Sequence, residues 1–192
     1  MENASVIFMN AKNLAFKRGC FDIAICGFMG WDDCFDFNLN QFKKPDTKIT
    51  EIYRTLKDGG QFICCSWEMQ EDVQWLEDAV IRHHPAILED PEYLKHRPIG
   101  MAYEKAEGYE LILCSGGFRE IETINEEMTF VSTDKEEWWR QMQHLGWADI
   151  FEKVKPDRLQ SIKKAIFEEL QPYQHADGLH FNKRVFFIRG VK

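Results

Sequence analysis

The chain has 192 residues, of which 44% are hydrophobic and 29% are charged, and its formal net charge is -8. This length and balance predict one folded globular domain over residues 1–192 and exclude a disordered chain. The acidic balance disfavours nucleic acid as a partner. No apolar run reaches the roughly 18 residues of a membrane span, and the N-terminus has no signal-peptide pattern, so we expect a cytoplasmic protein with no membrane partner.

The first third of the chain predicts short strands that alternate with a helix. Residues 5–9 (SVIFM) and 21–26 (FDIAIC) are apolar runs typical of buried strands. Residues 47–56 carry apolar side chains at three- and four-residue spacing, which predicts a helix, and a glycine turn leads from it into a third strand at residues 61–67 (QFICCSW). This alternation favours an α/β fold with a parallel sheet covered by helices.

The remainder continues with both kinds of element. Helices are predicted at residues 71–83, 103–115, 133–145 and 156–170, strands at 119–131 and 181–189, and a proline-broken connection or lid at 85–98. The six cysteines form no CxxC pair, and no histidine cluster completes a zinc-like spacing. We therefore interpret the cysteines as free thiols and expect no metal site.

Two stretches carry a resemblance to a known family. Residues 10–28 (NAKNLAFKRGCFDIAICGF) combine an Asn-Ala pair, a Leu-Ala-Phe loop and a Phe-Asp strand start. Residues 49–67 (ITEIYRTLKDGGQFICCSW) combine a helix, a Leu-Lys-Asp-Gly-Gly turn and an apolar strand. Together they resemble the middle of class I S-adenosylmethionine (SAM) dependent methyltransferases of the type 11 group. Weaker matches at residues 117–118, 132–139 and 184–190 extend the resemblance over nearly the whole chain.

The resemblance implies a Rossmann-like, doubly wound, mostly parallel sheet with helices on both faces and a C-terminal antiparallel hairpin. In the family the strand order is three, two, one, four, five, seven, six. Residues 5–9 correspond to strand three and residues 21–26 to strand four. The family's glycine-rich loop follows strand one, so we expect an N-terminally truncated domain that lacks this motif.

The resemblance also implies a cofactor, SAM, and residues that would hold it. Ligands of a doubly wound sheet bind at the carboxyl ends of its strands. Asn10 stands where the family usually has an Asp that accepts from the adenine amino group, and Ala11 would leave room for the ring. Cys26, Gly27 and Phe28 would border the methionine end. Asn10 as a simple turn residue and Phe28 as a packing residue are the alternatives.

Residues on the acceptor side are less specified. Trp31, Tyr103 and Trp139 are candidates for binding a small-molecule substrate, with core packing as the alternative for each. No catalytic residue is assigned, although His83 and His84 stand near the proline-rich segment and a base there is one interpretation. SAM-dependent methyl transfer to a small molecule is the implied function. One alternative is a non-catalytic remnant of the fold that acts as a dimerisation or interaction module, and another is a binding protein for a different small ligand.

Loss of strands one and two would leave strand three without a neighbour and turn the strand at residues 21–26 into an edge, and a central apolar strand at an edge is prone to pair with another chain. Three outcomes follow: residues 5–9 pair with it, two copies pair their edges, or the chain is a fragment of a longer product. We hypothesise a homodimer through this edge, and we expect SAM to bind weakly or not at all.

Overall fold

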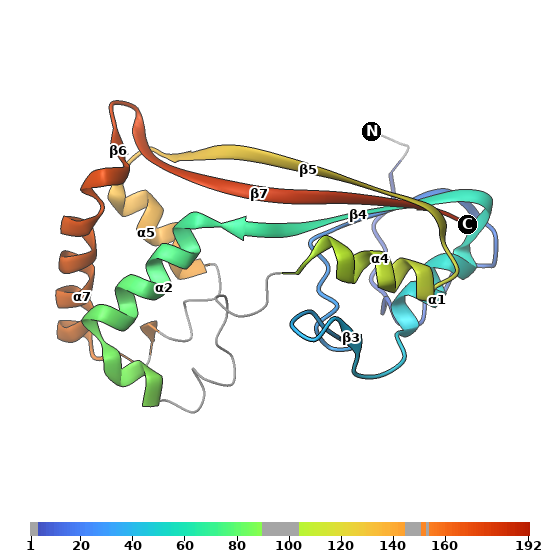
Figure 1. The fold of residues 1–192 in the computed structure, drawn as a ribbon, viewed down its shortest axis with the longest axis horizontal. Coiled ribbons are helices and arrows are strands. Elements are labelled where there is room, and N and C mark those ends of the chain that lie inside the picture. The colour runs from blue at the N-terminus through green and yellow to red at the C-terminus, as the bar shows by residue number, and fades with distance from the viewer. Residues whose placement is uncertain (1–3, 90–103, 145–150, 153) are drawn as a thin grey trace. The chain divides into compact units, whose positions relative to one another are not determined.

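A computed structural model describes residues 4–89, 104–144, 151–152 and 154–192 (Figure 1). The chain divides into two compact units. Unit 1 comprises Met1–Glu68, Glu104–Asn125 and Val185–Lys192, and unit 2 comprises Met69–Tyr103 and Glu126–Arg184. The expectation of a single domain remains a prediction.

The elements follow the predicted order closely. The strands are β1 (Phe21–Gly27), β2 (Phe35–Asp36), β3 (Gln41–Phe42), β4 (Leu56–Gln70), β5 (Arg119–Ser132), β6 (Gln174–His175) and β7 (Gly178–Val191). The helices are α1 (Thr47–Thr55), α2 (Glu71–His83), α4 (Ala106–Ser115), α5 (Lys135–His144) and α7 (Pro156–Glu169), with 3-10 turns η1 (Pro85–Glu89) and η2 (Gln171–Tyr173). Within the described ranges, no helix has the length and apolar character needed to cross a membrane.

The main sheet has the strand order β1-β4-β7-β5, with β6 paired to β7. β1 runs parallel to β4, and β6 runs antiparallel to β7. β7 is antiparallel to β5, because Thr129 bonds Asn182 while Gly178 lies against Ser132, so numbers rise along one strand as they fall along the other. The order four, five, seven, six and the C-terminal antiparallel pairing are thus confirmed, and the fold is a Rossmann-like α/β fold with a mixed sheet.

The strand predicted at residues 5–9 is wrong. These residues are irregular, the side chains of Val6 and Phe8 are fully exposed, and β4 is the only described strand that pairs with β1. An apolar run forms a strand only when a neighbour takes up its backbone N–H and C=O groups, and none of the described residues does so here. Residues 5–9 therefore do not cover the edge of β1 either.

The loop predicted at residues 27–40 contains more structure than expected. β2 and β3 form a separate two-stranded antiparallel sheet. Trp31 and Phe35 from this loop are fully buried. The turn at residues 57–60 is confirmed as a bulge within β4, since the register shifts from Phe21↔Leu56 to Ile23↔Gln61 and Gly59 has a φ of 77°.

Unit 1 has its core on one face of its part of the sheet. Helix α1 begins as predicted, since the Asp46 carboxylate accepts from the N–H groups of Lys48 and Ile49 at 2.9 and 3.1 Å. Helices α1 and α4 lie side by side (Figure 1). These two helices and the inward side chains of β4 and β7 form one core. Its members include Ile49 and Ile52 of α1, Ile112 and Leu113 of α4, Phe62 and Cys64 of β4, and Phe186 and Ile188 of β7.

The opposite face of the sheet in unit 1 is open among the described residues. Side chains that alternate with the core positions are exposed: Ile23 by 53%, Ile25 by 77%, Ile124 by 59% and Phe187 by 39%. The resemblance predicted helices on both faces, whereas α1 and α4 both pack on the same face.

Unit 2 packs α2, α5 and α7 around Trp138, Leu76 and Ile166, which are fully buried. The predicted start of α5 is confirmed. The Asp134 carboxylate accepts from the Glu137 N–H at 2.8 Å, and the Glu137 carboxylate accepts from the Thr133 N–H at 3.2 Å.

The turn between β6 and β7 depends on a glycine. Gly178 has a φ of 143°, and a Cβ there would overlap the Ser132 carbonyl oxygen. We expect Gly178→Ala to lower the free energy of unfolding by more than about 2 kcal/mol in urea titrations. Gly27→Ala is the control, since its Cβ would meet its nearest neighbour at 3.7 Å, and we expect a change within about 0.5 kcal/mol. Equal effects of the two variants would contradict this role for Gly178.

Candidate functional site

Because β1 and β4 are parallel, their carboxyl ends point toward the same end of the sheet. The last register pair is Gly27↔Cys65, and the Phe28 N–H continues the pairing with the Cys65 carbonyl at 2.9 Å. Phe28 then turns with a φ of 55°, and its half-exposed ring stacks on Trp67 with centroids 4.8 Å apart. The candidate site lies at this carboxyl end of β1, beside Cys65 of β4.

A buried lysine holds the loop that follows β1. Lys48, only 6% exposed, donates from Nζ to the Gly30 carbonyl at 2.8 Å and to Asp33 Oδ1 at 2.6 Å. Its ammonium also lies 4.8 Å from the ring centroid of Trp31. Lys12 reaches Asp33 Oδ2 at 2.6 Å, and the hydrogen bonds from Lys12 and Lys48 hold the pKa of Asp33 well below its usual range. The loop is therefore fixed to α1 by ionised groups.

A carboxylate ties the same loop to β4 and α4. Glu104 Oε1 accepts from the Trp31 N–H at 3.2 Å, and Oε2 accepts from the Tyr109 hydroxyl at 2.5 Å and from the Ser66 hydroxyl. Burial and then the charge of Glu104 raise the pKa of Tyr109, so its hydroxyl stays protonated. The Tyr109 oxygen is also 3.2 Å from the Met29 carbonyl.

Sequence reasoning missed Lys48, Ser66 and Glu104. Lys48 precedes Ile52 by four residues, so helical spacing places it on the buried face of α1. Ser66 alternates with Phe62 and Cys64 on the buried face of β4. A polar side chain on a buried face was the available signal for these two. No sequence pattern indicated Glu104, because Trp31 and Ser66, which bond to it, are distant in the sequence.

The predicted cofactor residues lie in unit 1. Cys26, Gly27 and Phe28 follow one another at the end of β1, and burial raises the pKa of the Cys26 thiol, which disfavours a thiolate there. Asn10 is exposed, and its Oδ1 accepts from the Lys12 N–H at 2.9 Å in a local turn. Their cofactor roles stay predictions.

The predicted substrate residues are not all in one unit. Trp31 is fully buried in unit 1 beside Tyr109. Trp139 belongs to the core of unit 2, where its ring stacks on Phe151 at 4.8 Å. Tyr103 lies outside the described residues, and His83 is 2.6 Å from Glu169 through Nε2. Substrate binding by these side chains stays a prediction.

The end of β1 fits one side of SAM. Gly27 is exposed, with Cys65 Sγ the nearest atom to an added Cβ, so a ligand can approach the backbone there. The other side would need a loop beside the free edge of β1, and no described strand pairs with that edge. The fit is therefore limited to the Cys26–Phe28 side, and no reaction step is assigned through the cofactor.

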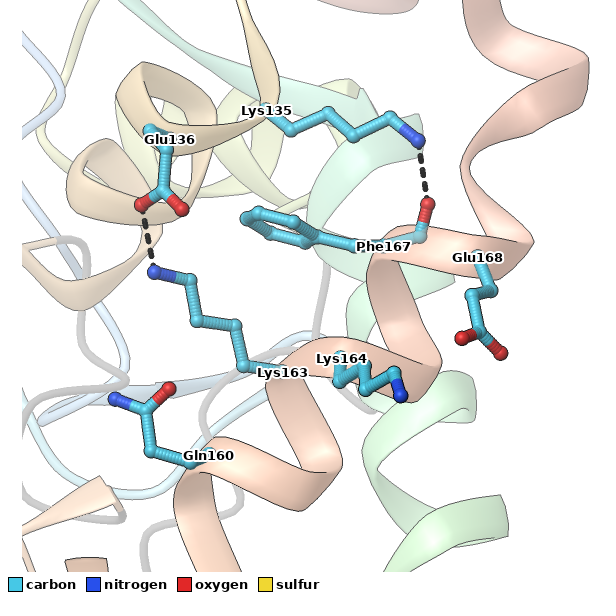
Figure 2. A pocket seen from close by; sticks show the side chains of 7 residues that line it. All are labelled: Lys135, Glu136, Gln160, Lys163, Lys164, Phe167 and Glu168. Atoms are coloured by element: carbon cyan, nitrogen blue, oxygen red, sulfur yellow. Dashed lines mark hydrogen bonds and ion pairs between the residues drawn. The ribbon is translucent and has the colours of Figure 1, made fainter.

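Two surface pockets are lined by other described residues. A pocket of about 470 Å³ in unit 2 is lined by Lys135, Glu136, Gln160, Lys163, Lys164, Phe167 and Glu168 (Figure 2). Lys135 donates to the Phe167 carbonyl at 2.5 Å and Lys163 pairs with Glu136 at 2.6 Å, so both ammonium groups already have partners. A second pocket of about 560 Å³, lined by Arg18, Gly19, Tyr53, Lys57, Asp58 and Lys192, lies where β1 and β4 begin.

Solved structures of methyltransferases have a similar chain path. A provisionally assigned methyltransferase of Bacillus halodurans is 17% identical with a TM-score of 0.48, and the match covers 96% of this chain and 75% of that one. A SAM-dependent methyltransferase of Archaeoglobus fulgidus is 13% identical with a TM-score of 0.43, over 99% and 68% of the chains. Phosphoethanolamine N-methyltransferase 2 of Haemonchus contortus, solved with phosphomonomethylethanolamine and S-adenosylhomocysteine, is 18% identical with a TM-score of 0.41, over 95% and 36%. No family model and no curated protein matches the sequence.

The Asp33 cluster predicts a pH dependence. The pKa of Asp33 is depressed in the folded protein, so its carboxylate stabilises the fold above its unfolded pKa of about 3.9, and this contribution is lost as pH falls below that value. Asp33→Asn should lower the free energy of unfolding by about 1–2 kcal/mol at neutral pH, discounted for the third of the side chain that solvent reaches. The difference from wild type should shrink below about pH 4. The exposed neighbour Asp32→Asn is the control, and a pH-independent Asp33 difference would contradict the assignment.

The Glu104 tie predicts a local effect on backbone opening. Glu104→Ala removes the acceptor of the Trp31 N–H, so this amide should exchange with solvent about tenfold faster by NMR. Glu107→Ala, an exposed change in the first turn of α4, should leave the Trp31 exchange rate unchanged. Unchanged exchange in Glu104→Ala would show that the loop is held without this carboxylate.

Proposed function

We propose that the chain is a SAM-dependent methyltransferase of class I type that acts on a small molecule in the cytoplasm, with a cofactor site that is incomplete among the described residues. The observation that carries this proposal is the strand order β1-β4-β7-β5, with β1 and β4 parallel and the last strand antiparallel to β5. This is the half-sheet implied by the motifs at residues 10–28 and 49–67. The polar cluster at the carboxyl ends of β1 and β4 lies where such sheets bind ligands.

Methyl transfer is a direct displacement that needs positioned reactants more than it needs proton transfer. SAM, when bound, supplies the electrophilic methyl group. Gly27 admits the ligand to the backbone and Phe28 flanks it, while the second lone pair of Asn10 Oδ1 remains to accept from the adenine amino group. Lys48 on α1 and Glu104, which precedes α4, each hold the loop after β1 in place. Trp31, Tyr103 and Trp139 remain the proposed substrate contacts.

Because the described residues supply only one side of the cofactor site, binding should be weak. We expect S-adenosylhomocysteine to shift the amide NMR resonances of Gly27 and Phe28 without saturating them at accessible concentrations. Gly27→Val should abolish these shifts, because its methyl groups would occupy the approach, whereas the exposed change Ile124→Val should preserve them. Absence of shifts in the wild type, or equal shifts in Gly27→Val, would contradict the methyltransferase proposal.

A second candidate function is a dimerisation or interaction module without catalysis. The observation that favours it is the unpaired edge of β1, where Ile25 is 77% exposed. Such an edge attracts another strand. On this proposal the chain is a homodimer joined through β1, and it retains the fold without needing the cofactor.

A further inference from the structure

The free edge of β1 presents the backbone groups of alternate residues. The Asp22 carbonyl lies on the β4 side, next to Gly60, and the Phe28 N–H bonds the Cys65 carbonyl of β4. Backbone direction alternates along a strand, so the even-numbered residues face β4. The N–H and C=O groups of Ile23 and Ile25 therefore point away from β4, where no described strand meets them.

The same two residues carry exposed apolar side chains. Ile23 and Ile25 project from the open face of the sheet, opposite Ala24 and Cys26, which pack toward the core of unit 1. Phe187 of β7 is exposed on that open face as well. Backbone groups that no described strand pairs and exposed β-branched side chains therefore occur together on one short strand. This combination favours the addition of another strand.

Charge distinguishes β1 from the other edge of the sheet. β1 carries a single acid, Asp22, which pairs with Lys57 at 2.7 Å. β5 carries two acids in unit 1, Glu120 and Glu122; Glu122 pairs with Arg189 at 3.1 Å, but two β5 edges would still bring carboxylates of both copies together. Each copy has a net charge of -8, so an interface between copies must avoid its acidic surfaces. The charge pattern selects β1 as the edge that a second copy can approach.

We propose that two copies pair β1 with β1, antiparallel, about a two-fold axis at Ala24. This gives an interface to the homodimer of the second proposed function, and it does not depend on cofactor binding. In this register Ile23 lies opposite the partner's Ile25, and the reverse holds by symmetry. The two pairs form four backbone hydrogen bonds, and all four isoleucines lie on the same face of one continuous sheet.

Other registers are less complementary. Pairing Ile25 with the partner's Ile25 places Ile23 opposite Gly27, which has no side chain. Pairing Ile23 with the partner's Ile23 places Ile25 opposite Phe21 and Asp22 opposite Ala24. Only the register centred on Ala24 pairs every isoleucine with an isoleucine and leaves Asp22 opposite the uncharged Cys26.

Sedimentation equilibrium of the full chain and two lysine variants tests the interface. Ile25→Lys places a charge on the proposed edge and should raise the dimer dissociation constant at least about tenfold. Ile124→Lys makes the same change at a comparably exposed isoleucine on β5 and should leave the constant unchanged. Both side chains are exposed, so circular dichroism should show native secondary structure in each variant.

Each outcome bears on a different part of the proposal. A monomeric wild type would overturn both the homodimer and its interface. A dimer that survives Ile25→Lys, or that both variants weaken equally, would overturn the β1 interface while leaving the homodimer. For the register, Ala24→Cys should oxidise to a disulfide between two identical peptides, identified by mass spectrometry, because the two Ala24 Cα atoms would lie about 4.5 Å apart. Failure of this link under oxidation would overturn the register centred on Ala24.

Discussion

The parallel pairing of β1 with β4 is the constraint on which the site depends. It places Gly27, the last residue of β1, beside Cys65 of β4, so the loop after β1 begins next to the β4 residues that follow Cys65. Ser66 and Trp67 on β4 can then reach Glu104 and Phe28 respectively. Had the strands been antiparallel, these groups would lie at opposite ends of the sheet and no common site could form.

Buried charged groups hold the loop after β1 in addition to apolar packing. Lys48 lies almost fully out of solvent, which would be costly without partners, and it has two acceptors and an aromatic ring. Glu104 satisfies three donors from three separate segments of the chain. Networks of this kind fix one arrangement of a loop, because a displaced member leaves a buried charge or donor without a partner. The loop after β1 is thus held in one arrangement by groups from three other segments.

The two faces of the sheet in unit 1 differ in what covers them. One face is buried by α1 and α4, while the other exposes isoleucines along β1 and β5. Methyl transfer and self-association make different demands on this arrangement. The proposed methyl transfer uses the carboxyl end of β1 at Gly27, and the proposed self-association uses its edge at Ile23 and Ile25. The two proposals concern different atoms of one strand, so neither requires the other.

Much of the fold could be predicted from the sequence, because the deciding interactions are local. The Asp46 cap of α1 and the reciprocal contacts of Thr133 and Glu137 at α5 lie within four residues in sequence. The turn at Gly59 and the apolar run of β1 are equally local signals. The strand order was predicted through the family resemblance, since no local pattern specifies which strands are neighbours.

Only the tertiary structure decided the remainder. Residues 5–9 have the composition of a strand, yet a strand forms only where a neighbour takes its hydrogen bonds. Trp31 was a candidate ligand contact, and its burial depends on Tyr109 and Lys48, which are distant in sequence. The role of Glu104 likewise follows from Ser66, 38 residues away. The sequence by itself determined most helices and long strands and the caps of α1 and α5. The tertiary structure determined which polar groups meet at the end of β1 and which strand edge no described residue pairs with, because both depend on contacts between distant segments.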